Sequence, residues 1–600
     1  MPEPAETQPL PRLSDPLASQ VEPTTQVEAD RAVINAARGK GPASLLGAFV
    51  KLSGPGWLQS AITLGGGSLA GSLYLGVLAG TDLLWLQPLA MILGVIMLSA
   101  IAYVTLSTRQ RPFEAIRLHV NPVLAWAWAI GTMLANFVWC MPQFTLGESA
   151  LTQNLAPGLF AGMSETSADL ACVAILFSLA AVVSWFYESG GRGIKLFELI
   201  LKLMVGVVVI SFFGVIIKML ASGTLDFGRL LAGFVPDVSL LLNPAEAFRE
   251  PIAAAGEFSG WWREQIVTEQ QRRMITTVGT AVGINMTFLL PYSMLARGWG
   301  RDFRGLATFD LSTGLLIPFV VATTCVVVAA ATQFHASYDE ALVAGEVTDD
   351  NRDLQGSYAK QLAARVKAEV GAEAYAAMSA DETAAAAAAL PAADRRLAAM
   401  LVTRDARHLA VALRPLMGER LSGLVFGIGV FAMAVSTIII LMLINGFVVC
   451  EMLGRPGDAT IHRVAAFACA AVGALGPFAW KEASFYLAVP TSMFGYAMLP
   501  IAYITFFCLM NSRTLLGEHM PTGLSRVIWN TLMGVACTLT VIGSFWAIYK
   551  SAVPWVGFAI VGGLLVVALS VHFAKLGTLN EQAARRDDTS PVDAKPLDGE

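Results

Sequence analysis

Long apolar runs separated by short polar connections are the main pattern along this chain. Each run can supply the roughly 20 apolar residues that a helix needs to cross a hydrocarbon core about 30 Å thick. We therefore predict an all-α polytopic membrane protein with about twelve spanning helices. Their approximate spans are 46–79, 83–107, 122–151, 168–187, 193–220, 271–298, 305–334, 419–451, 462–480, 483–510, 524–548 and 553–575.

The positive charges of the connections alternate along this map. Cytoplasmic loops carry the excess of Lys and Arg in membrane proteins, and every second connection here is basic. The basic set is Arg109, Arg111, Arg117, Arg192, Lys195, Arg297, Arg301, Arg304, Arg455, Arg463, Arg513 and Arg526, whereas the short connections between contain only Lys481 and Lys550. This alternation predicts an integral protein of the plasma (cytoplasmic) membrane with both termini in the cytoplasm.

The composition supports the same class of protein. Hydrophobic residues make up 55% of the 600 residues and charged residues 14%, against about 25% charged in an average soluble domain. With Lys+Arg 40 and Asp+Glu 45 the net charge is −5, so no basic field predicts a nucleic-acid partner. The seven cysteines include no C-x-x-C pair, which argues against a disulfide framework or a zinc site. We expect no cofactor, and a lipid bilayer as the surroundings.

Four segments fall outside the predicted helices. Residues 1–45 and 576–600 have the composition of disordered cytoplasmic tails. Residues 221–270 form an outer loop whose Trp261 and Trp262 are most simply interfacial anchors, with a substrate lid as the alternative. Residues 335–418 are charged and rich in Ala, and we predict an extramembrane helical appendage there.

The first predicted helix contains a glycine cluster, Gly65-Gly66-Gly67-Ser68. Each glycine weakens a helix by about 1 kcal/mol relative to alanine, and backbone groups freed in hydrocarbon need other partners. Packing motifs usually space their glycines by four residues. The cluster therefore predicts an unwound stretch near the middle of the membrane.

The sixth predicted helix carries an interruption of its own at Phe288 to Met294, where Pro291 removes a hydrogen-bond donor. The two breaks fall on the first helix of each half if the chain divides into helices 1–5 (46–220), helices 6–10 (271–334 and 419–510) and two extra helices (511–575). Paired interruptions of this kind indicate a transporter built from inverted repeats, with its solute bound at the midplane between the broken helices.

At these residues the chain resembles the natural resistance-associated macrophage protein (NRAMP) family of divalent metal transporters, which have the leucine-transporter fold. Gly54-Pro55-Gly56, Ser60 and the break at 65–68 look like the family's first-helix signature. The resemblance covers helices 1–10: Gly193, Lys195 and Glu198 are similar to its helix-5 entrance, Leu290-Pro291-Tyr292-Ser293 falls on its Met-Pro-His-Asn break, and Asn445-Gly446-Phe447 with Glu451 resembles its helix-8 end. The resemblance implies alternating access to a metal site.

The chain departs from the family at the ligand positions. The family motif Asp-Pro-Gly-Asn falls on Gly65 to Ser68, so the metal-binding carboxylate is missing. The family methionine falls on Leu290, which cannot ligate a metal. The helix-3 acids associated with proton movement fall on Met141 and Phe144, which leaves Glu148 as the nearby candidate for a proton relay.

The remaining groups define a neutral candidate site. We predict that solute is bound by Gly65, Gly66, Gly67, Ser68, Thr63, Asn285, Leu290, Tyr292 and Ser293. A hydrated Mg²⁺ or Mn²⁺ would suit such a site, because Mg²⁺ keeps several of its waters. A half-helix that begins with free N–H groups would instead suit an amino acid or small organic anion. A membrane enzyme or sensor that uses the 335–418 segment is a further alternative, although no catalytic motif supports it.

Overall fold

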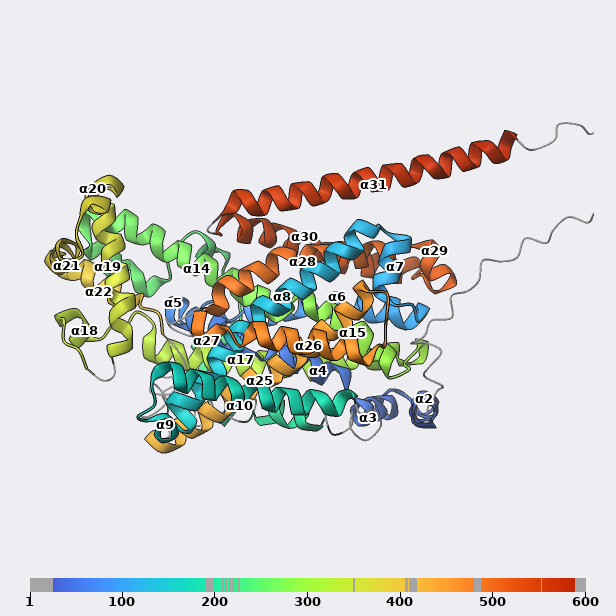
Figure 1. Ribbon diagram of the computed structural model, residues 1–600, viewed down its shortest axis with the longest axis horizontal. Helices are drawn as coiled ribbons and strands as arrows, with labels where there is room; N and C mark the ends of the chain where they lie inside the picture. Colours follow the sequence, from blue (N-terminus) through green and yellow to red (C-terminus); the bar gives the residue numbers. More distant parts are fainter. Residues whose placement is uncertain are drawn as a thin grey trace, which may run out of the picture.

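The computed structural model describes residues 25 to 588, apart from most positions of 189–226, 349–350, 405–417 except His408, 480–486 and 552. Within these residues every regular element is a helix. Ten described helices or helix runs are long and apolar enough to cross a membrane. The pair α4 (Pro55–Thr63) and α5 (Gly66–Ala79), bent by 56°, makes an eleventh span. The all-α polytopic class is confirmed (Figure 1).

The described spans follow the predicted order. In the first half they are the α4–α5 pair, α6 (Leu86–Thr108), α8 (Pro122–Ser149) with the π-helix η1 (Ala150–Leu155), and α10 (Glu165–Glu188). The second half contains α14 (Ser259–Ala281), α15 (Ile284–Ala296), α16 (Arg304–Asp310), η6 (Leu311–Leu316), α17 (Ile317–Phe334), α25 (Glu419–Met452), α26 (Ala459–Gly473), α27 (Gly476–Ala479) and α28 (Ala488–Met510), and α30 (Gly523–Tyr549) and α31 (Pro554–Asp588) follow. Half of the predicted segment 193–220, including Gly193, Lys195 and Glu198, falls outside the described residues.

Both predicted tails are partly helical, which corrects the sequence prediction. The helix α2 (Thr25–Arg38) lies within the segment predicted as a disordered tail, and α31 runs on to Asp588. Arg31 pairs with Asp302 at 3.1 Å, and Arg38 donates to the Asp302 carbonyl at 2.9 Å. These contacts fasten α2 to the connection between α15 and α16 and give the helix a partner that composition does not reveal.

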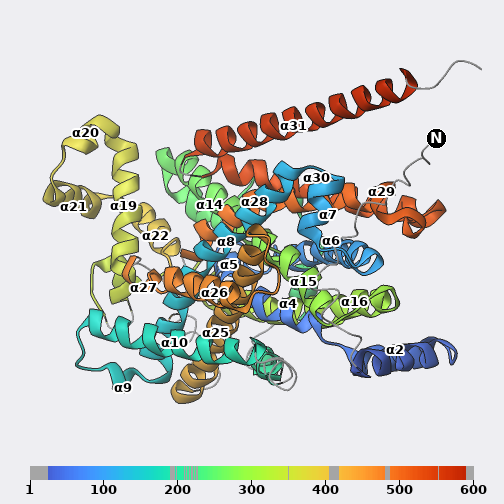
Figure 2. The same ribbon diagram turned by 45° about the vertical axis from the view of Figure 1, so that its right-hand side comes forward.

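Different sets of helices lie at the two ends of the bundle (Figures 1 and 2). One end carries α2, α3 (Pro42–Leu52), α7 (Pro112–His119) and α29 (Arg513–Leu516), and we call it the terminal side. The opposite end carries α18 (Glu340–Ala344), α19 (Gln355–Val370), α20 (Ala372–Ala377), α21 (Ala380–Ala389) and α22 (Ala392–Met400), and we call it the insert side. The half-helices α4 and α15 lead from the breaks toward the terminal side, and α5 and α14 lead toward the insert side.

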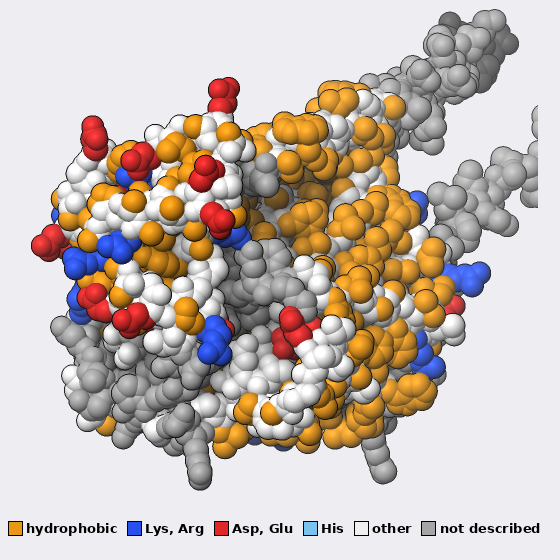
Figure 3. Space-filling model, turned by 60° about the vertical axis from the view of Figure 1, so that its left-hand side comes forward, with side chains coloured by type: hydrophobic (Ala, Val, Ile, Leu, Met, Phe, Trp, Pro, Cys, Tyr) orange, Lys and Arg blue, Asp and Glu red, His pale blue; other side chains and the backbone are white. Residues whose placement is uncertain are grey.

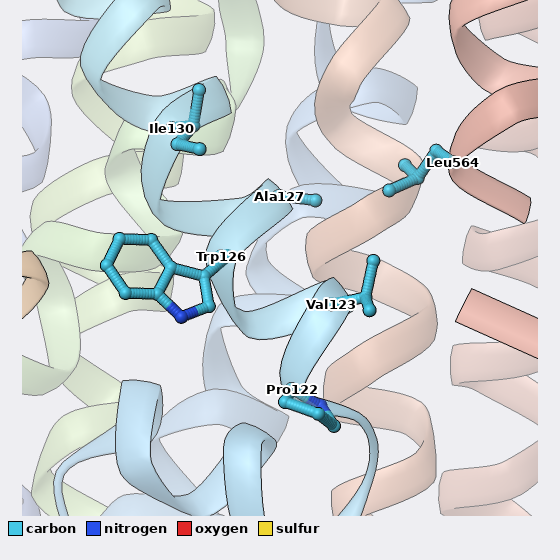
Figure 4. Close-up of a pocket in the computed structure, with 6 residues that line it drawn as sticks. All are labelled: Pro122, Val123, Trp126, Ala127, Ile130 and Leu564. Atoms are coloured by element: carbon cyan, nitrogen blue, oxygen red, sulfur yellow. The ribbon is translucent and has the colours of Figure 1, made fainter. Parts of the chain in front are cut away.

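Apolar side chains cover the flanks of the bundle, whereas charged side chains gather on the insert (Figure 3). On α30, Leu532, Val535, Leu539 and Ile542 are exposed by 41 to 59% and recur at helical spacing. A groove of about 370 Å³ between α8 and α31 is likewise apolar. It is lined by Pro122, Val123, Trp126, Ala127, Ile130 and Leu564 (Figure 4). Such a surface suits acyl chains, so we assign it to lipid contact.

A buried ion pair inside the insert lies against the N-terminal part of α14. Arg365 of α19 and Asp394 of α22 have side chains exposed by 2% and 1%, and Arg365 Nε lies 3.1 Å from Asp394 Oδ1. Trp262 of α14 donates its indole N–H to the same carboxylate, and the Arg365 guanidinium lies 3.2 Å from the Phe258 ring centroid. Trp262 is therefore fully buried against the insert. The simple interpretation of Trp262 as an interfacial membrane anchor is wrong.

Contacts at the insert side also join the two half-helices α5 and α14. Tyr74 of α5 donates its hydroxyl to the Arg404 carbonyl at 2.7 Å, and Arg273 of α14 lies over the Tyr74 ring at 4.3 Å. His335, directly after α17, contacts the Val77 carbonyl through Nδ1 at 3.1 Å. Together these contacts join α5 to α14 and to residues near both ends of the insert.

Candidate functional site

The two breaks predicted for the first and sixth helices are present, but the second lies elsewhere. The first falls at Leu64 and Gly65, at the start of the predicted stretch, and α5 already begins at Gly66. The second falls at Val282 and Gly283, between α14 and α15, whereas Pro291 lies inside the continuous α15. Inside a membrane bundle a proline can stay within a helix, because neighbouring helices satisfy the backbone group that it frees, and Ile284 to Met294 are all buried against such neighbours. The expected break at 288–293 is therefore wrong by about two helical turns.

Close approach of neighbouring side chains explains the glycines at the first break. A Cβ on Gly65 would lie 2.5 Å from Oγ1 of Thr437, and one on Gly67 would lie 2.8 Å from Cγ2 of Thr280. Real Cβ atoms essentially never come so close to other atoms. The neighbouring side chains therefore occupy the space that any residue larger than glycine would need. The glycine run thus serves the packing of the break as well as its unwinding.

Side chains from α8 and α25 satisfy backbone groups that the first break leaves free. The Gly66 N–H donates to Oε1 of Gln143 at 3.0 Å. The Ala61 carbonyl, near the end of α4, accepts from Ser436 Oγ at 3.1 Å and from Thr437 Oγ1 at 3.3 Å. In a membrane such groups need protein partners. The break is therefore a stable part of the fold.

A small cavity lies beside the first break and between six helices. Its volume is about 30 Å³, which is room for roughly one or two water molecules. The lining residues are Ile62, Thr63, Gly65, Gly67, Ser68, Trp139, Pro142, Gln143, Thr280, Thr437, Ala488, Thr491 and Ser492. They come from α4, α5, α8, α14, α25 and α28 and the break itself. Residues from both halves of the predicted inverted repeat therefore line the cavity.

The polar side chains that line the cavity are all neutral. Six of the lining side chains are hydroxyls and one is the amide of Gln143, and none is ionisable. Among the described residues no group of three or more His, Cys, Asp and Glu could hold a metal ion. The lining offers oxygens that can hydrogen-bond to water or ligate a cation weakly, but no charge to compensate for the loss of an ion's hydration shell.

The predicted site residues divide into two groups. Thr63, Gly65, Gly67 and Ser68 line the cavity, and Gly66 is bonded beside it to Gln143. The other predicted residues, Asn285, Leu290, Tyr292 and Ser293, lie on α15 beyond the second break and are buried in helix packing. Tyr292 is stacked on Phe288, with centroids 4.6 Å apart.

Sequence reasoning missed a sulfur atom at the site. Thr63 donates its hydroxyl to Sδ of Met286 at 3.2 Å, and Met286 is the third residue of α15, 1% exposed. The resemblance places the family methionine at Leu290, beside Pro291, whereas the break at Val282 and Gly283 lies close before Met286. A methionine soon after a glycine is the sequence signal that points to this sulfur.

Glu148, the predicted proton relay, does not line the cavity. It lies at the insert-side end of α8, where its Oε1 accepts from Thr152 Oγ1 at 3.0 Å and its Oε2 from Ser149 Oγ at 3.4 Å. Its role in proton movement stays a prediction. If Glu148 carries the proton, a correctly folded Glu148→Gln variant will show uptake into liposomes that no longer depends on pH. An unchanged pH profile of uptake would exclude Glu148 as the proton relay.

The Gly54-Pro55-Gly56 sequence anchors α4 at its N-terminus. The Asp310 carboxylate, fully buried at the end of α16, accepts from the Gly54 N–H at 3.1 Å and from the Gly56 N–H. A negative group at a helix N-terminus is stabilised by the helix dipole. A Cβ on Gly56 would lie 2.3 Å from the Asp310 carbonyl oxygen, so only glycine permits this contact.

Comparisons with known proteins agree with this architecture. The model of the family described as natural resistance-associated macrophage protein-like matches residues 56–365 and 370–546, which is most of the chain. This chain belongs to the NRAMP-like family. The NRAMP-like sequence finds no match among curated protein sequences.

Solved structures show the same fold for this NRAMP-like chain. A crystal structure of a mutant of the Eremococcus coleocola manganese transporter has a TM-score of 0.58 at 13% identity, covering 89% of this chain and 96% of that one. The structure of the same transporter with an aromatic bis-isothiourea substituted compound gives 0.58 at 13% identity, covering 90% and 97%. Family membership makes the chain a membrane transporter of the metal-ion class. Its neutral cavity is the feature in which this member departs from the family motif.

Proposed function

We propose that this NRAMP-like protein carries a divalent cation of the Mg²⁺ or Mn²⁺ type across the membrane by alternating access, with part of the ion's hydration shell retained. The observation that carries the proposal is the cavity at the first break, lined by six hydroxyls and one amide without any carboxylate. Hydroxyl and carbonyl oxygens can bond to the waters of a hydrated ion, whereas a bare divalent ion would need anionic ligands.

The size of the cavity supports alternating access. A space of about 30 Å³ holds roughly one or two water molecules, so a hydrated ion needs the surrounding helices to move apart before it enters. The half-helices α4, α5, α14 and α15 meet at the two breaks, and breaks are where backbone angles can change most easily. This conformation corresponds to a closed stage of the cycle.

A small organic anion or amino acid is the second candidate, and one observation favours it. Gly67 and Ser68, in the first turn of α5, line the cavity, and a helix N-terminus attracts carboxylates. The Gly66 N–H is already taken by Gln143, which weakens this candidate. Both solutes would use the same cavity and the same movement.

Uptake into liposomes distinguishes the two candidates. Purified protein in liposomes loaded with a metal-sensitive dye is expected to admit Mg²⁺ or Mn²⁺.

Gly67→Val, whose side chain would meet Thr280 and Ser492, is expected to reduce the rate of this uptake at least tenfold by filling the cavity. Gly562→Val is the matched control, because Gly562 on α31 has nothing within 4 Å of its Cβ position. Silence with every divalent ion, together with uptake of labelled alanine, would overturn the proposal in favour of the second candidate.

A further inference from the structure

Trp139 of α8 occupies a slot that two glycines form at the edge of the cavity. A Cβ on Gly283, in the second break, would lie 2.2 Å from Cη2 of Trp139, and one on Gly495 of α28 would lie 2.6 Å from Cζ2. The indole N–H donates to the Thr491 carbonyl at 2.8 Å. The ring therefore bridges α8, the second break and α28, and any side chain larger than hydrogen at either glycine would push it out.

The ring lies at the terminal side of the cavity. Along α8, which runs from the terminal side to the insert side, Trp139 precedes the other lining residues Pro142 and Gln143. Along α28, which runs the opposite way, Gly495 comes one turn after Ser492. Both helices thus place the indole between the cavity and the terminal side of the molecule.

Beyond Trp139 the same direction is filled by packed aromatic rings. Trp128, three turns before Trp139 on α8, lies 4.4 Å from the Phe288 ring centroid, and Phe288 is stacked on Tyr292. Tyr292 in turn lies 5.8 Å from Phe447 of α25. These rings hold α15 against α8 and α25, so Trp139 is the first of several barriers that a solute meets on leaving the cavity toward the terminal side.

We propose that Trp139 is the specificity-determining residue of this transporter: its indole is the removable wall that limits the cavity to small solutes and closes it toward the terminal side. Passage then requires the ring to leave the slot between Gly283 and Gly495, which couples the exit of solute to movement of the second break. The part of this inference that concerns selectivity rests on the proposed transport function, whereas the wall itself is a statement about geometry.

Thiol labelling tests the wall without reference to any solute. The probe is Ser492→Cys, in a background in which the two least buried cysteines, Cys508 and Cys537, are serines. A charged methanethiosulfonate is added to the liposome face from which the insert is protected against trypsin. Trp139→Ala is expected to raise the labelling rate at least tenfold, and Trp139→Phe to a smaller extent. Trp126→Ala, on the same helix but at the lipid-facing groove (Figure 4), is expected to leave the rate unchanged.

Selectivity is measured on the same variants. The ratio of Mg²⁺ uptake to labelled ethylammonium uptake is expected to fall at least tenfold in Trp139→Ala. Equal labelling rates in folded Trp139→Ala, Trp139→Phe and parent proteins would overturn the inference. A raised labelling rate with an unchanged uptake ratio would overturn the selectivity role. A raised labelling rate in a protein that moves no divalent ion at all would sustain the wall and refute the proposed function, so the two failures can be told apart.

Discussion

Asp394→Ala is expected to destabilise the insert by about 3–5 kcal/mol, because it leaves the charge of Arg365 buried without its main partner. The Arg365 and Asp394 side chains are exposed by only 2% and 1%, and Trp262 would lose its acceptor as well. The effect should appear as a lower midpoint of thermal unfolding and as faster tryptic cleavage within residues 335–418.

Glu369→Ala provides the matched control for this change. Glu369 contacts the same guanidinium at 2.8 Å, but its side chain is 52% exposed, and exposed ion pairs contribute roughly 0–1 kcal/mol. Each variant removes one carboxylate that contacts Arg365, and the two carboxylates differ in how deeply they are buried. Equal loss of stability in both would show that the insert does not depend on the buried pair.

Restoring a carboxylate to the first break is expected to create a transition-metal site. Gly65→Asp alone should fold poorly, because its Cβ would lie 2.5 Å from Thr437 Oγ1. The double variant Gly65→Asp with Thr437→Ala removes that clash, and Ser436 still donates to the Ala61 carbonyl. Calorimetry should show binding of Mn²⁺ or Cd²⁺ at least a hundredfold tighter than in the parent protein, because an anionic ligand offsets the loss of hydration.

Substitutions at Met286 and Leu290 test which of these two positions can supply a sulfur ligand to the engineered metal site. The Met286 sulfur already contacts Thr63, so Met286→Leu in the double variant should remove most of the gain for Cd²⁺, which prefers soft ligands. Neither methionine position lines the cavity, but Leu290→Met should add nothing, because Leu290 lies one turn beyond Met286 on α15, farther from the second break. A gain that depends on Leu290→Met and ignores Met286 would contradict this placement of the second break.

The first break could be predicted from the sequence because its cause is local. Three consecutive glycines weaken a helix wherever they occur, and of these residues Gly65 lies in the break while Gly65, Gly67 and the following Ser68 line the cavity. The second break has no such local mark. Val282 and Gly283 form an ordinary pair in the sequence, and Gly283 is required by the approach of Trp139 from another helix. Pro291, the stronger local signal, is tolerated within α15.

Partners that lie far apart in the sequence account for the other differences. Trp262 resembles a membrane anchor until Asp394, 132 residues later, is placed beside it. The hydroxyls of Thr437, Thr491 and Ser492 carry no motif, and only helix packing brings them to the first break. The length of the apolar runs and the charges of the connections therefore predicted the order of the spans, whereas the walls of the cavity depended on tertiary contacts.

The contacts of Tyr74 with Arg404 and Arg273 have a mechanical consequence. Because these contacts join α5, α14 and the insert, we expect the three to move together about Gly65 and Gly283 in the transport cycle proposed above, so that opening at that end would involve the insert as well as the two half-helices.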